Sequence, residues 1–253
     1  FIFFGMNKWS FGNNGTPFLG TDIDWLENKL EEYRNERVFI FMHPFFPDRC
    51  GNYRRLYNNS CWLQGTQLTK LEELCDHYKN SIWFSGHSHW KWDRQKYEKT
   101  ANIYKKNSGY CVHVPSCAYP RTDSNGTGSM AEKPKESEGA VVDVYENFIV
   151  IKGRDLKGEK YLPIAQYKLD TTIINIDAKV TYTVTNNLTN CTNSSTVASV
   201  IEGKGYSTNI SANNGYILSN VTVTMGGINI TASCYNNGAI NISNVTGDIV
   251  ITA

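Results

Sequence analysis

Two apolar runs mark the first half of the chain, one over residues 38–42 and the other over residues 82–85. Continuous apolar runs of four to eight residues are typical of strands that are buried on both faces, as in sheets covered by helices. Such strands alternate with helices in α/β proteins. We therefore expect an α/β domain with these two runs as central strands.

Helical spacing of apolar residues occurs twice. Residues 22–34 are expected to form one helix, with a start signal at Thr21 and Asp24. A second helix is indicated by the apolar face of Leu68, Leu71, Leu74, Cys75 and Tyr78. Further along, residues 141–145 and 148–152 alternate on either side of a two-residue connection, which predicts a β-hairpin.

The last third of the chain alternates between apolar and small polar residues, for example over 180–185 and 221–224. This period of two predicts strands with one buried face, and Asn-Gly and Gly-Gly turns separate them at short intervals. Charge also falls abruptly here, because only Glu202, Lys204 and Asp248 are charged between Thr181 and Ala253. We expect two domains, residues 1–171 and residues 172–253, the second a small all-β sandwich without a helix.

Histidines follow both apolar runs. His43 comes directly after the first run, and Gly86-His87-Ser88-His89 comes directly after the second. In sheets flanked by helices, ligands gather at the carboxyl ends of strands, so both groups should lie on one rim. Gly86 is expected to permit a sharp turn. A single histidine in such a place is more often a hydrogen-bonded core residue, but the repetition favours a metal site, since zinc, iron and nickel prefer imidazole.

The order of strand, His43-Pro44, long loop, helix, strand and Gly-His-x-His resembles the carboxyl-terminal half of a calcineurin-like metallophosphoesterase. The resemblance covers roughly residues 1–170. It extends to four later stretches, residues 112–116, 119–121, 139–145 and 161–165. It implies a sheet sandwich flanked by helices that hydrolyses phosphoric esters with two divalent metal ions, of the Mn, Fe, Zn or Ni type. By the same resemblance, His43 and His87 would bind one ion and His89 the other.

The first ligand motifs of that family, Asp-x-His, Gly-Asp-x-x-Asp and Gly-Asn-His, do not occur in this sequence. The chain opens on Phe1-Ile2-Phe3-Phe4, which is expected to be a strand inside a domain. We therefore expect an upstream segment to supply the carboxylate that bridges two metal ions. Residues 1–253 alone are expected to be inactive, and no catalytic residue is assigned apart from the metal ligands.

Four residues are candidates for contacting the substrate: Arg49, Trp90, His113 and Arg121. Arg49 belongs to a long loop after His43, whose basic and aromatic residues suit an anionic group. A solvated loop that only covers the sheet edge is the equal alternative. For Trp90 and His113 the alternative is packing in the core.

The tail is similar to the Asn- and Thr-rich immunoglobulin-like repeats of phage tail and bacterial surface proteins. That resemblance implies an extracellular, cell-surface or virion location, with a cell-surface glycan or other virion proteins as partners. A second interpretation is therefore a structural or adhesion component in which the esterase-like domain is a non-catalytic scaffold. A third combines the two, as a phage-tail hydrolase that cuts teichoic-acid-like phosphodiesters.

Composition and charge exclude few functional classes. The net charge of +1 gives no overall field that would attract nucleic acid, no nucleic-acid motif occurs, and no stretch is long enough for a membrane-spanning helix. A homo-oligomer is compatible with the sequence. Seven cysteines without a Cys-x-x-Cys motif leave three pairings open, Cys50 with Cys61, Cys111 with Cys117, and Cys191 with Cys234.

Overall fold

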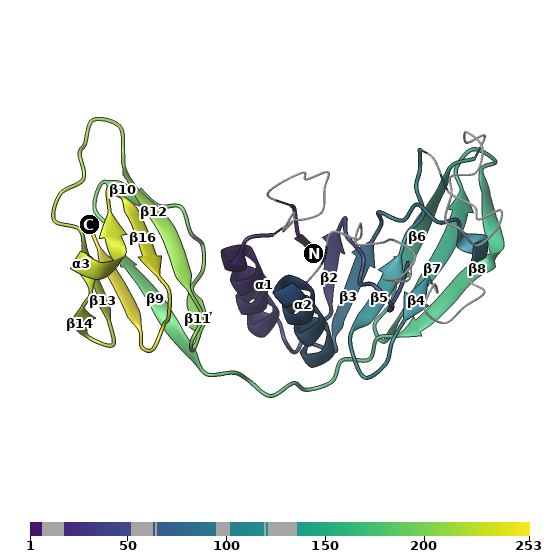
Figure 1. Cartoon of the computed structure of the whole chain (residues 1–253), viewed down its shortest axis with the longest axis horizontal. Helices are drawn as coiled ribbons and strands as arrows, with labels where there is room; N and C mark the ends of the chain where they lie inside the picture. Colours follow the sequence, from purple (N-terminus) through teal and green to yellow (C-terminus); the bar gives the residue numbers. More distant parts are fainter. Residues whose placement is uncertain (7–17, 52–62, 64, 95–101, 119, 121–135) are drawn as a thin grey trace. The chain divides into compact units, whose positions relative to one another are not determined.

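The computed structural model describes the chain except for residues 7–17, 52–62, 64, 95–101, 119 and 121–135. The described part is a mixed α/β protein with several sheets and few helices (Figure 1). It divides into two compact units. The first unit comprises Phe1–Leu19 and Tyr33–Ile176, and the second comprises Gly20–Glu32 and Asp177–Ala253.

The first unit is built around a five-stranded sheet with the strand order β1-β2-β3-β5-β4. Its strands are β1 (Ile2–Phe3), β2 (Val38–Met42), β3 (Ser81–Ser85), β4 (Ile103–Tyr104) and β5 (Tyr110–His113). The four strands β1, β2, β3 and β5 are parallel, whereas β4 runs antiparallel to β5. Both apolar runs are therefore central strands, as the sequence predicts.

A second, antiparallel sheet of the same unit consists of β6 (Glu138–Val144), β7 (Phe148–Asp155) and β8 (Lys160–Asp170). The predicted hairpin is its β6–β7 pair, closed by a hydrogen bond from Tyr145 N to Phe148 O of 2.9 Å. Ile151 of this sheet shares a buried core with Phe84 of the first sheet.

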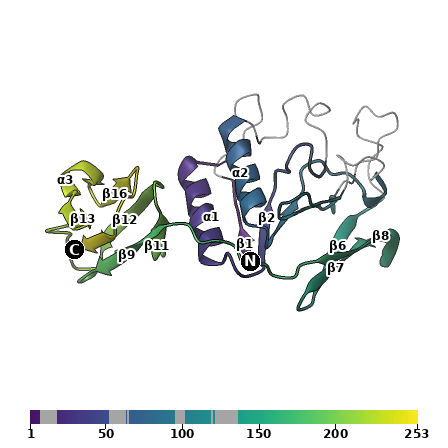
Figure 2. The same cartoon turned by 90° about the horizontal axis from the view of Figure 1, so that it is seen from below.

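Helix α2 (Gly65–His77) lies on the other side of the parallel sheet (Figures 1 and 2). Cys75 of this helix contacts Cys111 of β5, with 3.7 Å between the two sulfur atoms. The parallel strands are thus covered on both faces, which explains why they read as continuous apolar runs. A short 3-10 helix, η1 (Trp92–Arg94), follows the turn after β3.

Helix α1 (Gly20–Glu32) belongs to the second unit, although it is far from that unit in sequence. The carboxylate of Glu27 in α1 forms ion pairs with the side-chain amines of Lys179, at 2.6 Å, and Lys204, at 2.5 Å. The Asn28 side chain accepts a hydrogen bond of 2.8 Å from the backbone N–H of Ile201. The division expected from sequence placed this helix with residues 1–171, because a pattern of apolar positions does not show which surface a helix covers.

Two sheets of the second unit enclose one core. The strands are β9 (Thr181–Asn187), β10 (Cys191–Asn193), β11 (Ser199–Ile201), β12 (Tyr206–Ala212), β13 (Thr222–Met225), β14 (Ile228–Asn229), β15 (Tyr235–Asn236), β16 (Ala239–Ile242) and β17 (Ile249–Thr252). One sheet has the order β10-β12-β16-β15 and the other β11-β9-β17-β13-β14. Ile210 and Ile240 come from the first of these, and Val223 and Ile251 from the second.

The expectation that the tail contains no helix is wrong, because Thr231–Cys234 form the short helix α3. Cys234 at its end is buried in the common core, so one turn of helix here brings a small apolar side chain inward. Where the structure describes the chain, no helix is long and apolar enough to cross a membrane.

Candidate functional site

Three neighbouring parallel strands end at the same edge of the first sheet. Met42 of β2 pairs in register with Ser85 of β3, and Ser85 pairs with His113 of β5. His43 and Gly86 are the next residues after the first two strands. The carboxyl ends of β2, β3 and β5 therefore form one rim, and each of them carries or leads into a histidine.

His43 and His87 contact each other at this rim. Nε2 of His43 lies 3.2 Å from Nδ1 of His87, and the two rings meet edge to face with 5.1 Å between their centroids. The backbone N–H of Gly86 donates to the carbonyl oxygen of His43 at 3.2 Å, which fixes the two strand ends to each other. Phe45 stacks on the ring of His87 at 5.9 Å. We call His43 and His87 the histidine pair.

The turn after β3 takes its shape from histidines rather than from glycine. His87 and His89 have left-handed backbone, with φ of 68° and 60°. Gly86 lies outside that region, and a Cβ there would come no closer than 4.0 Å to the nearest backbone oxygens. The expectation that Gly86 permits the turn is therefore wrong. A left-handed backbone costs a residue with a side chain about 1–3 kcal/mol, and functional sites are common places for such strain.

His113 contacts this turn from the buried interior of the first unit. It is completely buried, and its Nε2 lies 3.0 Å from the hydroxyl oxygen of Ser88. Gly51, with φ of 86°, is so close that a Cβ there would come within 3.0 Å of His113 Nδ1. Burial, with the nearby charge of His89, lowers the pKa of His113 to about 3, so the ring is neutral at physiological pH. Sequence reasoning missed the contribution of Ser88 to this arrangement.

Three thiols lie beneath the rim, and no sequence pattern predicts that they come together. Cys75 and Cys111 are 3.7 Å apart, and Cys50 lies 3.8 Å from the hydroxyl of Ser85. All three are completely buried, and burial raises the pKa of Cys111 well above its ordinary value. Such thiols behave as small apolar groups.

Neither of the expected cysteine pairings that the structure describes in full is formed. Cys111, Cys117, Cys191 and Cys234 are all free thiols. Cys50 is free as well, and its expected partner, Cys61, lies outside the described residues.

The other three residues that were expected to contact the substrate are Arg49, Trp90 and Arg121. Arg49 forms a two-pronged ion pair with Asp76 of α2, at 2.7 and 3.0 Å, and lies over the ring of Phe46. Trp90 is buried, with an exposed fraction of 4%. Arg121 and most of the long loop after Arg49 lie outside the described residues.

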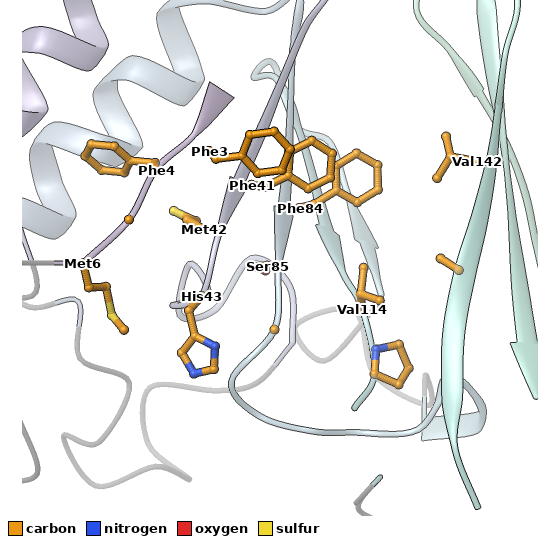
Figure 3. A pocket seen from close by; sticks show the side chains of 14 residues that line it. Phe3, Phe4, Met6, Phe41, Met42, His43, Phe84, Ser85, Val114 and Val142 are labelled. Atoms are coloured by element: carbon orange, nitrogen blue, oxygen red, sulfur yellow. The ribbon is translucent and has the colours of Figure 1, made fainter. Parts of the chain in front are cut away.

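A cavity of about 620 Å³ opens beside the histidine pair. His43 stands at one end of it, and an apolar wall containing Phe41 and Phe84 extends from there toward β1 (Figure 3). Burial lowers the pKa of His43 below its ordinary value, which favours the neutral imidazole that can bind a metal ion.

Within the described residues, no group of three or more His, Cys, Asp or Glu is arranged to hold a metal ion. A scan against protein-family models and a search among curated proteins both return no match for the chain. The resemblance given above therefore rests on this chain's own residues.

Proposed function

We propose that the chain belongs to a metal-dependent phosphoric ester hydrolase, in which the histidine pair binds one divalent ion and His89 contributes to a second. The two-sheet unit at the carboxyl end would serve as an immunoglobulin-like module for attachment or binding at a surface. One observation carries the proposal: two imidazole nitrogens, His43 Nε2 and His87 Nδ1, lie 3.2 Å apart at neighbouring strand ends.

The separation of these nitrogens suits a shared ion. With metal–nitrogen bonds of 2.0–2.1 Å and tetrahedral angles, two imidazole ligands of zinc stand about 3.3 Å apart. The alternative is a hydrogen bond between the rings, in which one nitrogen donates and the other accepts. The two arrangements have a similar distance between the nitrogens. To bind one ion, both rings must turn their lone pairs from the line between the nitrogens toward a common point.

The surroundings of the pair fit this role. Burial favours the neutral form of His43, which is the form that donates a lone pair to a metal. The turn that carries His87 and His89 is supported by the hydrogen bond between Ser88 and the buried His113. Groups that hydrogen-bond directly to metal ligands affect metal affinity by about 10- to 100-fold, and the Ser88–His113 contact would act on His87 and His89 indirectly, by holding the turn.

The expected chemistry is that of a divalent metal ion held by His43 and His87. A divalent ion, when bound, neutralises charge on phosphoryl oxygens and acidifies a bound water. His43 and His87 would fix the position of the phosphoryl group at the rim, and the adjoining apolar cavity would exclude water from one side of it. A complete site needs further ligands, because zinc-type sites take three or four groups.

A second candidate function is a structural or adhesion component with a non-catalytic scaffold, for example on a phage tail or a bacterial cell surface. It is favoured by the lack of a three-ligand group among the described residues. Fold alone does not decide between the two, since a fold can be kept while a site is lost.

Metal titration separates these candidates. Calorimetric titration of the chain with Mn²⁺ and Zn²⁺ is expected to show binding that His43→Ala and His87→Ala each weaken by at least about tenfold. His77→Ala is the matched control, because α2 ends at His77, near the start of β3 and away from the rim. If the ions bind and all three variants bind them equally, the ions lie away from the rim and the scaffold function replaces the hydrolase.

A further inference from the structure

The cavity beside the histidine pair lies between the two sheets of the first unit. Phe3, Phe41 and Phe84 of the parallel sheet line one wall, and Val142 of β6 faces them from the other sheet (Figure 3). Its volume of about 620 Å³ falls in the range of small-molecule sites, roughly 300–1,000 Å³. It is therefore large enough for a ligand.

The aromatic wall is continuous. The rings of Phe3 and Phe41 stack with centroids 5.0 Å apart, and those of Phe41 and Phe84 stack at 5.1 Å. Phe3 nevertheless keeps an exposed fraction of 77%. A large aromatic side chain left this open beside a cavity gains free energy when an apolar group covers it.

Polar groups are confined to one end of the cavity. His43, Ser85 and Gly86 line that end, whereas the rest of the lining is apolar. Binding sites of this type hold an apolar body in the hydrophobic part and orient it through a few polar contacts. The distribution here suits a ligand with one polar head and an apolar tail or ring.

We propose that this cavity binds the apolar group of an amphiphilic phosphoester, an alkyl or aryl phosphate whose phosphoryl group lies against the histidine pair. Only the position of the ligand's phosphoryl group rests on the proposed function. The position of the ligand's apolar group depends only on the cavity. The cavity is formed by the Phe3–Phe41–Phe84 wall and Val142, and it requires no metal ion.

The two faces of β6 provide a matched pair of variants. Val142 lines the cavity, while Val141 is absent from its lining, as expected because successive side chains of a strand point to opposite faces. Val142→Phe would project a larger side chain into the cavity and narrow it, and Val141→Phe adds the same bulk on the other face. Both positions are half-buried on a strand that accepts aromatic residues. Circular dichroism verifies that each variant is folded.

The experiment is calorimetric titration of the 253-residue chain with hexyl, octyl and decyl phosphate, each below its micellar concentration, with and without Mn²⁺. We expect affinity to rise about fourfold for each added methylene that the cavity covers. Val142→Phe should reduce this dependence on length, because the narrowed cavity covers fewer methylenes, and Val141→Phe should keep it. His87→Ala should weaken the binding of all three phosphates by a similar factor in the presence of Mn²⁺.

The outcomes distinguish the cavity from the proposed function. Affinity that does not depend on chain length, in a protein that still binds Mn²⁺ through His87, overturns the apolar site and leaves the hydrolase standing. Affinity that rises with chain length and loses part of that dependence in Val142→Phe, but that is the same in His87→Ala as in the unmodified chain even with Mn²⁺, retains the apolar site. That second result overturns the placing of the phosphoryl group, and the hydrolase with it.

Discussion

Nε2 of His113 lies 3.0 Å from Oγ of Ser88, so a completely buried imidazole at the end of β5 is tied to the middle of the turn that carries His87 and His89. The two candidate ligands on that turn have strained backbone. A turn of this kind keeps its shape only if its surroundings hold it. We infer that Ser88 and His113 position the candidate ligands without binding metal themselves.

Removing this hydroxyl should therefore affect both stability and metal binding. Ser88→Ala leaves a buried imidazole nitrogen without its partner, which is expected to lower the free energy of unfolding by about 1–3 kcal/mol. Mn²⁺ affinity should fall by about 10-fold, as for other groups that orient ligands. Urea unfolding and calorimetric titration measure the two effects. Ser211→Ala, on an exposed position of β12, is the control; equal behaviour of the two variants would exclude the positioning role.

The three thiols beneath the rim should resist modification in the folded protein. Cys50, Cys75 and Cys111 are fully buried, and burial raises the pKa of Cys111, so the reactive thiolate is scarce. Cys117 is exposed. Brief treatment with a thiol reagent such as iodoacetamide, followed by peptide mass spectrometry, is expected to label Cys117 well before these three. Labelling of Cys111 at the same rate as Cys117 would show that the first unit opens readily or packs differently.

The charged contact of helix α1 predicts how the second unit responds to pH. Burial opposes the ionisation of Glu27, but hydrogen bonds from Lys179 and Lys204 outweigh it and lower the pKa of Glu27 below its ordinary 4.5. Its ionised form therefore contributes fully above pH 4.5, and the contribution is lost as pH falls through the lower pKa of the folded state.

Glu27→Gln should lower the free energy of unfolding of the second unit by about 1.5–3 kcal/mol at pH 7. The difference from the unmodified chain should shrink as pH falls below the ordinary glutamate pKa, because Glu27 is then protonated in the unfolded chain first and becomes neutral in the folded chain below its lower pKa. Urea unfolding at pH 7 and pH 3.5 measures this. Glu202→Gln, an exposed glutamate of the same unit, should change stability by less than about 0.5 kcal/mol. A difference for Glu27→Gln that is unchanged at low pH would contradict the ion-pair explanation.

The sequence was informative where a local pattern determines structure. Continuous apolar runs predicted strands covered on both faces, and the position of His43 and His87 directly after two such strands predicted that they would lie on one rim. Parallel strands that are neighbours in a sheet bring their carboxyl ends together whatever the loops do. The roles of these histidines as metal ligands stay predictions.

What the sequence did not predict depends on contacts between distant segments. Ser88 meets His113 only because β3 and β5 are adjacent and in a particular register. Cys75 meets Cys111 because α2 packs on that face of the sheet. The left-handed backbone of His87 could not be predicted for a different reason. Glycine is the usual residue in that conformation, so the sequence indicated that Gly86, and not His87, permits the turn.

The last prediction concerns catalysis, where the number of ligands decides. His43, His87 and His89 would leave each of two metal ions with at most two protein ligands, whereas a zinc-type site takes three or four. Two divalent cations held only by neutral imidazoles also repel each other, and a shared carboxylate normally reduces that repulsion. Residues 1–253 alone should therefore hydrolyse bis-p-nitrophenyl phosphate negligibly, even with Mn²⁺ in excess.

A chain extended at its amino end by Asp-x-His, Gly-Asp-x-x-Asp and Gly-Asn-His motifs should be active with Mn²⁺, because those motifs supply the missing carboxylates. In that longer chain His87→Ala should lower kcat by roughly two orders of magnitude, as expected when a group that stabilises transition-state charge is lost. His77→Ala should leave it unchanged. If the longer, folded chain binds no metal and cleaves no phosphoester, the rim of β2, β3 and β5 is a scaffold, and its histidine pair is held by a hydrogen bond between the rings alone.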